Sequence, residues 1–202
     1  YIADGHHRSK SAEMLFDEND PMTGESKNHF MSFAIADSNV KIYEYNRLIK
    51  DLNGLGKPAF LEKLESHFNI EIKNGNFQPC EKHTFGMYLE NDFYSLSLKE
   101  HQFDIDSALG RLDAQILYEK VLLPILGIED LRSDERIEYS SGKQPISEVK
   151  NKVDSGEFEL AFLLFPATIE EIKAIADAHQ VMPPKSTYIE PKFRSGLVVY
   201  EL

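Results

Sequence analysis

The chain has very little of several residue types, and each shortage excludes a class of protein. Its 202 residues contain one cysteine, Cys80, and no tryptophan. A single cysteine excludes an internal disulfide and a cluster of thiolate metal ligands, and this composition is expected in a reducing cytoplasm. There is no run of 18 apolar residues, so we expect no transmembrane helix.

Basic residues are scarce as well. Lys and Arg total 22 against 34 Asp and Glu, which gives a net charge of −12. An acidic surface repels a phosphate backbone, so broad binding to nucleic acid is disfavoured, whereas a local basic patch can still hold one nucleotide. Hydrophobic residues make up 42% of the chain, enough to build a packed core.

The first residues lack the features of a chain start. They include neither a methionine nor a signal-like apolar stretch, and Tyr1-Ile2-Ala3 has the composition of the end of a buried strand. We therefore expect a fragment whose N-terminal half is missing.

Short strand-like and helix-like segments are mixed along the chain, which predicts an α+β fold with mixed or antiparallel sheets, hairpins and flanking helices. Two hairpins are predicted, at 29–45 and 84–98. The longest helix is predicted at 107–123, and residues 17–28 are predicted to be an exposed loop.

The last third of the chain alternates strand and helix. Thr168-Ile169-Glu170-Glu171 is a capping box and predicts a helix that continues to about residue 179. A closing strand is predicted at 198–200. We place a domain boundary in the loop 129–135, which divides the chain into a region 1–128 and a strand–helix–strand–helix–strand subdomain 129–202.

The richest chemistry lies in the first turn, Asp4-Gly5-His6-His7-Arg8. Gly5 lets a ligand approach the main chain, the following helix offers unpaired N–H groups, and Arg8 adds a planar fork of donors suited to phosphate. Asp4 could orient a hydroxyl, hold a metal ion or act as a general base, and His6 and His7 could donate to phosphate or move a proton. The alternative is that Asp4 only caps the helix and the histidines are solvated.

Two other places are candidate phosphate contacts. Lys185, Ser186 and Thr187 follow two prolines that fix the direction of the chain, although the glycine pattern of a P-loop is absent. The alternative there is a rigid surface loop. Arg47 is the third candidate, with a surface salt bridge as its alternative.

The residues Ile2 to Arg8 resemble the signature of ParB and sulfiredoxin-like domains, in which a strand, a glycine–arginine turn and a helix bind nucleotide phosphates. Sulfiredoxin carries a cysteine directly after the motif glycine, where this chain has His6. The resemblance therefore points to phosphate chemistry and not to redox chemistry.

Longer stretches resemble a prokaryotic family known as domain of unknown function 1015 (DUF1015), whose members extend further at the N-terminus. The segments that carry this resemblance are 1–12, 45–49, 112–128 and 182–196. In that family a Thr-His-Arg commonly stands where this chain has Tyr45-Asn46-Arg47.

These resemblances imply a protein that binds a nucleotide or phosphate, and relatives of the ParB type include kinases of free serine that use ATP or ADP with magnesium. The implied activity is an ATP- or ADP-dependent kinase of a small, serine-like molecule. The alternative is a non-catalytic regulatory or DNA-associated ParB-like module. No side-chain metal site is predicted. The implied catalytic residues are Asp4, His6 and His7, and the implied phosphate contacts are Gly5, Arg8, Arg47, Lys185, Ser186 and Thr187.

Overall fold

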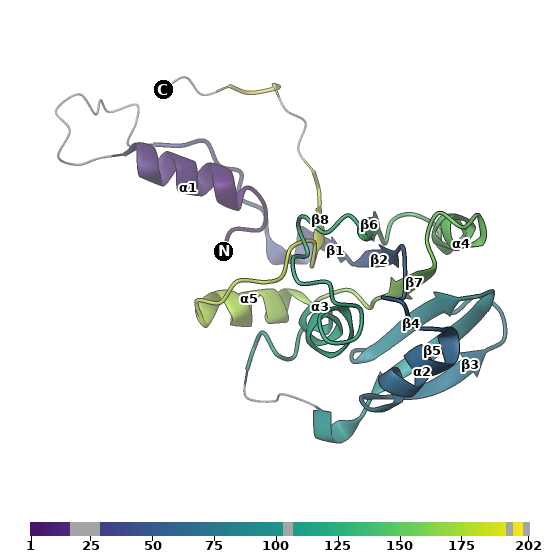
Figure 1. The fold of residues 1–202 in the computed structure, drawn as a ribbon. Coiled ribbons are helices and arrows are strands. Elements are labelled where there is room, and N and C mark those ends of the chain that lie inside the picture. The colour runs from purple at the N-terminus through teal and green to yellow at the C-terminus, as the bar shows by residue number, and fades with distance from the viewer. Residues whose placement is uncertain (17–28, 103–106, 193–195, 200–202) are drawn as a thin grey trace. The chain divides into compact units, whose positions relative to one another are not determined.

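The computed structural model describes residues 1–16, 29–102, 107–192 and 196–199, which form a mixed α+β fold with antiparallel sheets (Figure 1). The α+β class predicted from the sequence is confirmed. The chain divides into two compact units, Tyr1–Lys41 with Ile189–Leu202, and Ile42–Tyr188. The predicted loop at 17–28 lies outside the described residues.

The first unit contains helix α1 (His6–Leu15) and the 3-10 turn η2 (Asp37–Asn39). The prediction of a hairpin at 29–45 is wrong, because residues 29–36 form no strand and β1 (Lys41–Tyr43) pairs with β8 (Tyr188–Glu190) instead. The apolar side chains at 29–36 do not face a core, since Phe30 and Phe33 are 56% and 65% exposed.

The second unit is built on a six-stranded sheet in the order β3-β5-β4-β7-β2-β6, and each neighbouring pair is antiparallel. The predicted hairpin at 84–98 is confirmed as β4 and β5. The sheet takes strands from both sides of the boundary predicted near residue 129. The strands are β2 (Tyr45–Ile49), β3 (Phe68–Lys73), β4 (Thr84–Leu89), β5 (Asp92–Leu98), β6 (Ile137–Ser141) and β7 (Leu160–Leu163).

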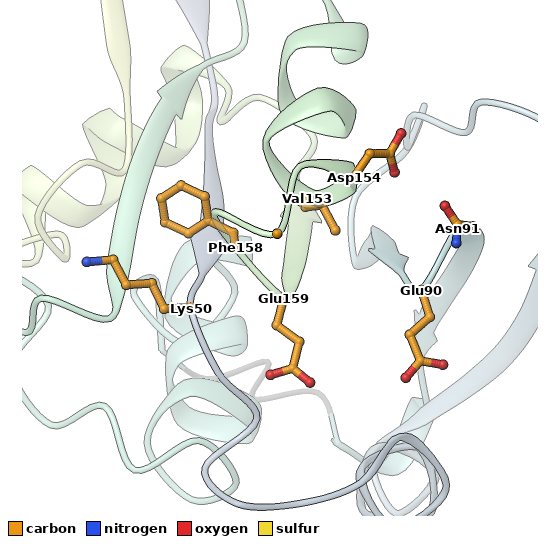
Figure 2. A pocket seen from close by; sticks show the side chains of 8 residues that line it. Lys50, Glu90, Asn91, Val153, Asp154, Phe158 and Glu159 are labelled. Carbon is orange, nitrogen blue, oxygen red and sulfur yellow. The ribbon is translucent and has the colours of Figure 1, made fainter.

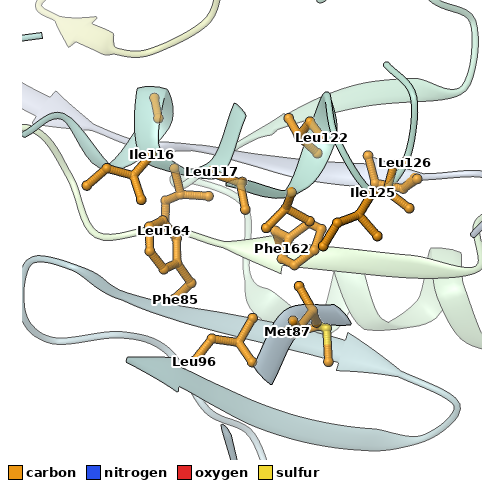
Figure 3. Packing of buried hydrophobic residues seen from close by; sticks show 14 of the residues in the cluster. Phe85, Met87, Leu96, Ile116, Leu117, Leu122, Ile125, Leu126, Phe162 and Leu164 are labelled. Carbon is orange, nitrogen blue, oxygen red and sulfur yellow. The ribbon is translucent and has the colours of Figure 1, made fainter. Parts of the chain in front are cut away.

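The two faces of this sheet carry separate hydrophobic clusters, because neighbouring residues of a strand point to opposite faces. Ile49, Met87 and Phe162 belong to the larger cluster. The helix α3 (Asp113–Leu117) and the π-helical turn η4 (Tyr118–Leu122) contribute Leu117 and Leu122 to it (Figure 3). The smaller cluster on the other face includes Val149 and Val153 of α4 (Ile146–Asp154), together with Leu48, Tyr88 and Ala161.

The longest predicted helix of the second unit is shorter in the structure than the sequence predicted. The helix expected at 107–123 begins only at Asp113, as α3, and changes to the π-helical turn at Tyr118. Among the described residues, no helix combines the length and apolar character needed to cross a membrane. The bounds are α2 (Lys57–Glu65), η3 (Glu100–Gln102), α3 (Asp113–Leu117), η4 (Tyr118–Leu122), α4 (Ile146–Asp154) and α5 (Ile169–Asp177).

The closing strand predicted at 198–200 is not formed by residues 198 and 199, and Tyr200 lies outside the described residues. The last strand among the described residues, Tyr188–Glu190, stands immediately after the Pro-Pro-Lys-Ser-Thr segment. Half-buried Tyr188 and buried Ile189 explain why the strand forms there and not in the exposed Leu197–Val199 segment.

The capping box predicted at the start of α5 is confirmed. The Glu171 backbone N–H donates to Thr168 Oγ1 at 3.2 Å, and the Thr168 N–H donates to Glu171 Oε2 at 2.8 Å. We expect Thr168→Ala to lower the free energy of unfolding by about 1 kcal/mol, because one helix N–H loses its acceptor. Urea unfolding would measure this, and Thr168→Ser, which keeps the hydroxyl, should retain most of the stability. An equal loss in both variants would contradict the capping role.

Candidate functional sites

The Asp4–Arg8 turn leads directly into α1. Gly5 is the N-cap residue of this helix and has φ 85° and ψ 25°, a left-handed conformation that glycine adopts without the strain of a β-carbon. The hypothesis that Asp4 is merely the N-cap is therefore wrong. Tyr1 to Ala3 do not form the predicted strand, and all three are exposed.

The guanidinium of Arg8 folds back over the start of its own helix. A β-carbon built on Gly5 would lie 3.1 Å from Arg8 Nη2 and 3.3 Å from Nε, so the absence of a side chain at residue 5 makes room for this arrangement. The first N–H groups of a helix carry partial positive charge. The turn thus combines that charge with an exposed guanidinium, which favours an anion.

Asp4 is held by two partners. Its Oδ1 accepts the Gly5 N–H at 2.8 Å and its Oδ2 pairs with Lys192 Nζ at 2.8 Å. The hydrogen bond from Lys192 is the main cause that lowers the pKa of Asp4, with further help from the Gly5 N–H and the charge of Arg8 against a partial desolvation. Asp4 is thus ionised at neutral pH and suited to accept a hydrogen bond from a hydroxyl.

The two predicted histidines both fall in the first turn of α1. His6 is its first residue and is exposed to solvent. His7 follows in the helix, and its side chain lies outside what the structure describes.

Arg47 lies on β2, opposite Tyr139 of β6 and Phe162 of β7, and only 1% of it is exposed. The guanidinium donates to the carbonyl oxygens of Tyr45 and, at 3.3 Å, Lys185, and it lies 5.6 Å from the centre of the Tyr139 ring. Burial lowers the pKa of Arg47 to about 10, so it remains charged at pH 7. The alternative of a surface salt bridge is wrong.

The Lys185 segment contacts Arg47 through its main chain. Lys185 has φ 55°, and its exposed side chain places Nζ 5.2 Å from the centre of the Tyr45 ring. Ser186 is buried and its hydroxyl donates to the Pro183 carbonyl at 2.7 Å, which stabilises the turn. Thr187 is half-buried.

The structure therefore brings together two groups of the predicted residues. Asp4, Gly5 and Arg8 meet in the first unit, and Arg47 meets Lys185 in the second. The sequence reasoning missed the tyrosines around the second group. Alternation along β2 could have placed Tyr45 on the face of Arg47, but the contact with Tyr139 depends on strand pairing across some 90 residues.

A hollow of about 400 Å³ lies elsewhere in the second unit, between the β4–β5 turn and the end of α4 (Figure 2). Three carboxylates line it, Glu90, Asp154 and Glu159. Glu90 pairs with Lys57 at 3.3 Å, and Asp154 accepts a hydrogen bond from the Tyr88 hydroxyl. An acidic lining disfavours phosphate, so this hollow is a poor candidate for the predicted function.

Comparison with known proteins identifies the family. The model of the family described as "Protein of unknown function (DUF1015)" matches residues 1–115, more than half of the chain. The chain belongs to the DUF1015 family. The matched residues include the Asp4–Arg8 turn and Arg47, whereas Lys185 lies beyond them. The ParB/sulfiredoxin-like character of the turn stays a prediction.

Solved structures show weaker similarity to this DUF1015 chain. A free serine kinase in complex with AMP is 18% identical with a TM-score of 0.42, and the alignment covers 94% of this chain and 66% of that one. A conserved hypothetical protein from Pyrococcus furiosus is 15% identical with a TM-score of 0.42, over 95% and 70% of the two chains. At these scores the similarities carry no functional inference. No curated protein matches the chain.

Proposed function

We propose that this DUF1015 chain binds ADP or ATP through the Asp4–Arg8 turn and transfers a phosphoryl group to the hydroxyl of a small, serine-like molecule. The observation that carries the proposal is the Arg8 guanidinium folded over Gly5 at the start of α1. It creates one point at which a side-chain cation and helix N–H groups favour the same anion.

Each residue of the turn has a role in this proposal. The main chain at Gly5 and the fork of Arg8 hold phosphate oxygens. Asp4 orients the acceptor hydroxyl and takes its proton as the new O–P bond forms and the bond to the leaving phosphate breaks. Asp4 becomes available when its ion pair with Lys192 opens, which costs little because the two side chains are 55% and 43% exposed. His6 and His7 donate hydrogen bonds to the phosphate, one of the roles predicted from the sequence, and so stabilise the charge on the phosphoryl group during its transfer.

Magnesium, which the sequence resemblance implies, finds no fitting site in the parts of the chain that the structure describes. No three His, Cys, Asp or Glu side chains there are arranged to hold a metal ion. We therefore assign no step to the ion.

Titration calorimetry with ADP, ATP and CTP tests the proposal. We expect Arg8→Ala to weaken nucleotide binding at least about 10-fold, which corresponds to roughly 1.4 kcal/mol. Lys10→Ala is the matched control, because it removes an equal charge from an exposed part of the same helix, where Lys10 pairs with Glu13 at 2.9 Å. It should bind as the unmodified chain does.

Two results would count against the proposal. Equal binding by Arg8→Ala and Lys10→Ala, or no binding of any of the three nucleotides, would exclude the turn as the nucleotide site. Binding without phosphoryl transfer to serine would leave the non-catalytic alternative.

A further inference from the structure

Arg47 carries a buried positive charge that no neighbouring carboxylate balances. Across residues 1–16, 29–102, 107–192 and 196–199, no acidic side chain forms an ion pair with it. Its partners are two carbonyl oxygens and the ring of Tyr139. Burial of a charge is unfavourable unless it is paired, so this arginine costs the folded chain stability without a counter-ion.

A second cation lies beside it. Lys185 Nζ forms no ion pair with a described carboxylate and lies over the Tyr45 ring, while the Lys185 carbonyl accepts from Arg47. Tyr45 in turn contacts Tyr188 edge to face, with ring centres 5.9 Å apart. In a chain with net charge −12, one main-chain segment thus links a buried arginine to an exposed lysine, and tyrosine rings border both side chains.

We infer that Arg47 and Lys185 form a second anion site, separate from the Asp4–Arg8 turn, which takes a doubly charged phosphate group. Exposed Lys185 contacts the phosphate. Arg47 is a positioning residue, because it is too buried to meet the ligand directly and acts through its charge and its hold on the Lys185 carbonyl. Two positive charges match a phosphate dianion better than a single carboxylate.

Ser186 and Tyr45 have supporting roles in this site. The Ser186 hydroxyl already donates to Pro183, so it shapes the turn that presents Lys185. The ring of Tyr45 lies under the Lys185 ammonium and limits the directions that this side chain can take.

Pyrophosphate binding, measured by calorimetry on the full chain carrying Arg8→Ala, tests the second site without a contribution from the turn. We expect Lys185→Gln in this background to weaken pyrophosphate binding about 10-fold. Lys63→Gln, an equal charge change at an exposed position of α2, should have no effect. Equal binding by the two variants, or no pyrophosphate binding in this background, would overturn the inference.

Arg47→Met separates a ligand-positioning role from a purely structural one. If Arg47 serves an anion, the variant should melt no lower than the unmodified chain and lose the increase in Tm that pyrophosphate produces. A lower Tm with an unchanged pyrophosphate shift would show a structural arginine and contradict the inference. If this variant does not fold, the comparison of Lys185→Gln with Lys63→Gln decides.

The test of the second anion site and the test of the proposed function can fail separately. The proposed function fails when Arg8→Ala and Lys10→Ala bind nucleotide equally, whether or not Lys185→Gln weakens pyrophosphate binding. The inference of a second site fails when Lys185→Gln and Lys63→Gln bind pyrophosphate equally, whether or not Arg8→Ala weakens nucleotide binding.

Discussion

Phe162→Ala is expected to lower the free energy of unfolding by about 3–5 kcal/mol. Phe162 is fully buried on β7, where it is paired in register with Arg47 on one side and Met87 on the other. Its ring fills the space between the sheet and the α3–η4 segment (Figure 3). Truncation removes the apolar contacts and leaves a cavity in the middle of the sheet, which the surrounding strands can only partly close.

Urea unfolding followed by circular dichroism measures this loss. Ile72→Ala is the control, because Ile72 is a large apolar residue of edge strand β3 that is 67% exposed. We expect its cost to stay within about 0.5 kcal/mol. A cost below about 1 kcal/mol for Phe162→Ala would show that β7 is not at the centre of the core.

Glu44→Gln is expected to stabilise the protein by about 2 kcal/mol at pH 8, because it removes a poorly paired buried charge. Only 3% of Glu44 is exposed. Gln78 Nε2 donates to its Oε1 at 3.4 Å, a long hydrogen bond, and the carboxylate lies against Gly142, where a β-carbon would collide with it. Burial raises the pKa of Glu44 above its ordinary value, and the hydrogen bonds from its own backbone and Gln78 only partly oppose this.

The sign of the pH dependence follows from the raised pKa of Glu44. The folded state binds the proton of Glu44 more tightly than the unfolded state, so protonation stabilises the fold and this contribution is lost as the pH rises through the raised pKa. The advantage of Glu44→Gln should therefore be largest at pH 8, shrink as the pH falls through the raised pKa of Glu44, and vanish below the ordinary pKa of a glutamate. Unfolding at pH 8 and pH 4 measures it, with exposed Glu62→Gln as the control. A lower stability of Glu44→Gln at pH 8 would mean that the carboxylate is needed as an ion.

Local signals in the sequence predicted the structure well where the interaction itself is local. The capping box depends on residues three apart, and Thr168 and Glu171 form it as expected. The hairpin at 84–98 has its two strands joined by a tight turn at Glu90 and Asn91, both with positive φ. Gly5 likewise has the left-handed conformation that a glycine permits in a turn, whereas its contact with phosphate stays a prediction.

Predictions failed where segments far apart in the sequence determine the strand pairing or the surroundings of a side chain. The sequence predicted that the strand at Lys41–Tyr43 pairs with the residues just before it in a hairpin. In the structure it pairs with β8, near the other end of the chain. Arg47 was expected at the surface or at a phosphate, and no pattern within β2 shows that Tyr139 and Lys185 enclose it. The sequence indicated that these residues carry chemistry, and the pairing of β2 with β6 determines their surroundings.

The position of β2 inside the sheet has a consequence for how the protein is made. Both neighbours of β2, β6 and β7, are encoded far downstream of it. At ordinary rates of translation, β2 leaves the ribosome several seconds before either neighbour exists. During that interval its apolar residues Leu48 and Ile49 and its backbone donors are unpaired, which is the condition in which strands aggregate. The nascent chain should thus depend on chaperones until β7 emerges, and truncated products that end before residue 160 should accumulate as insoluble protein.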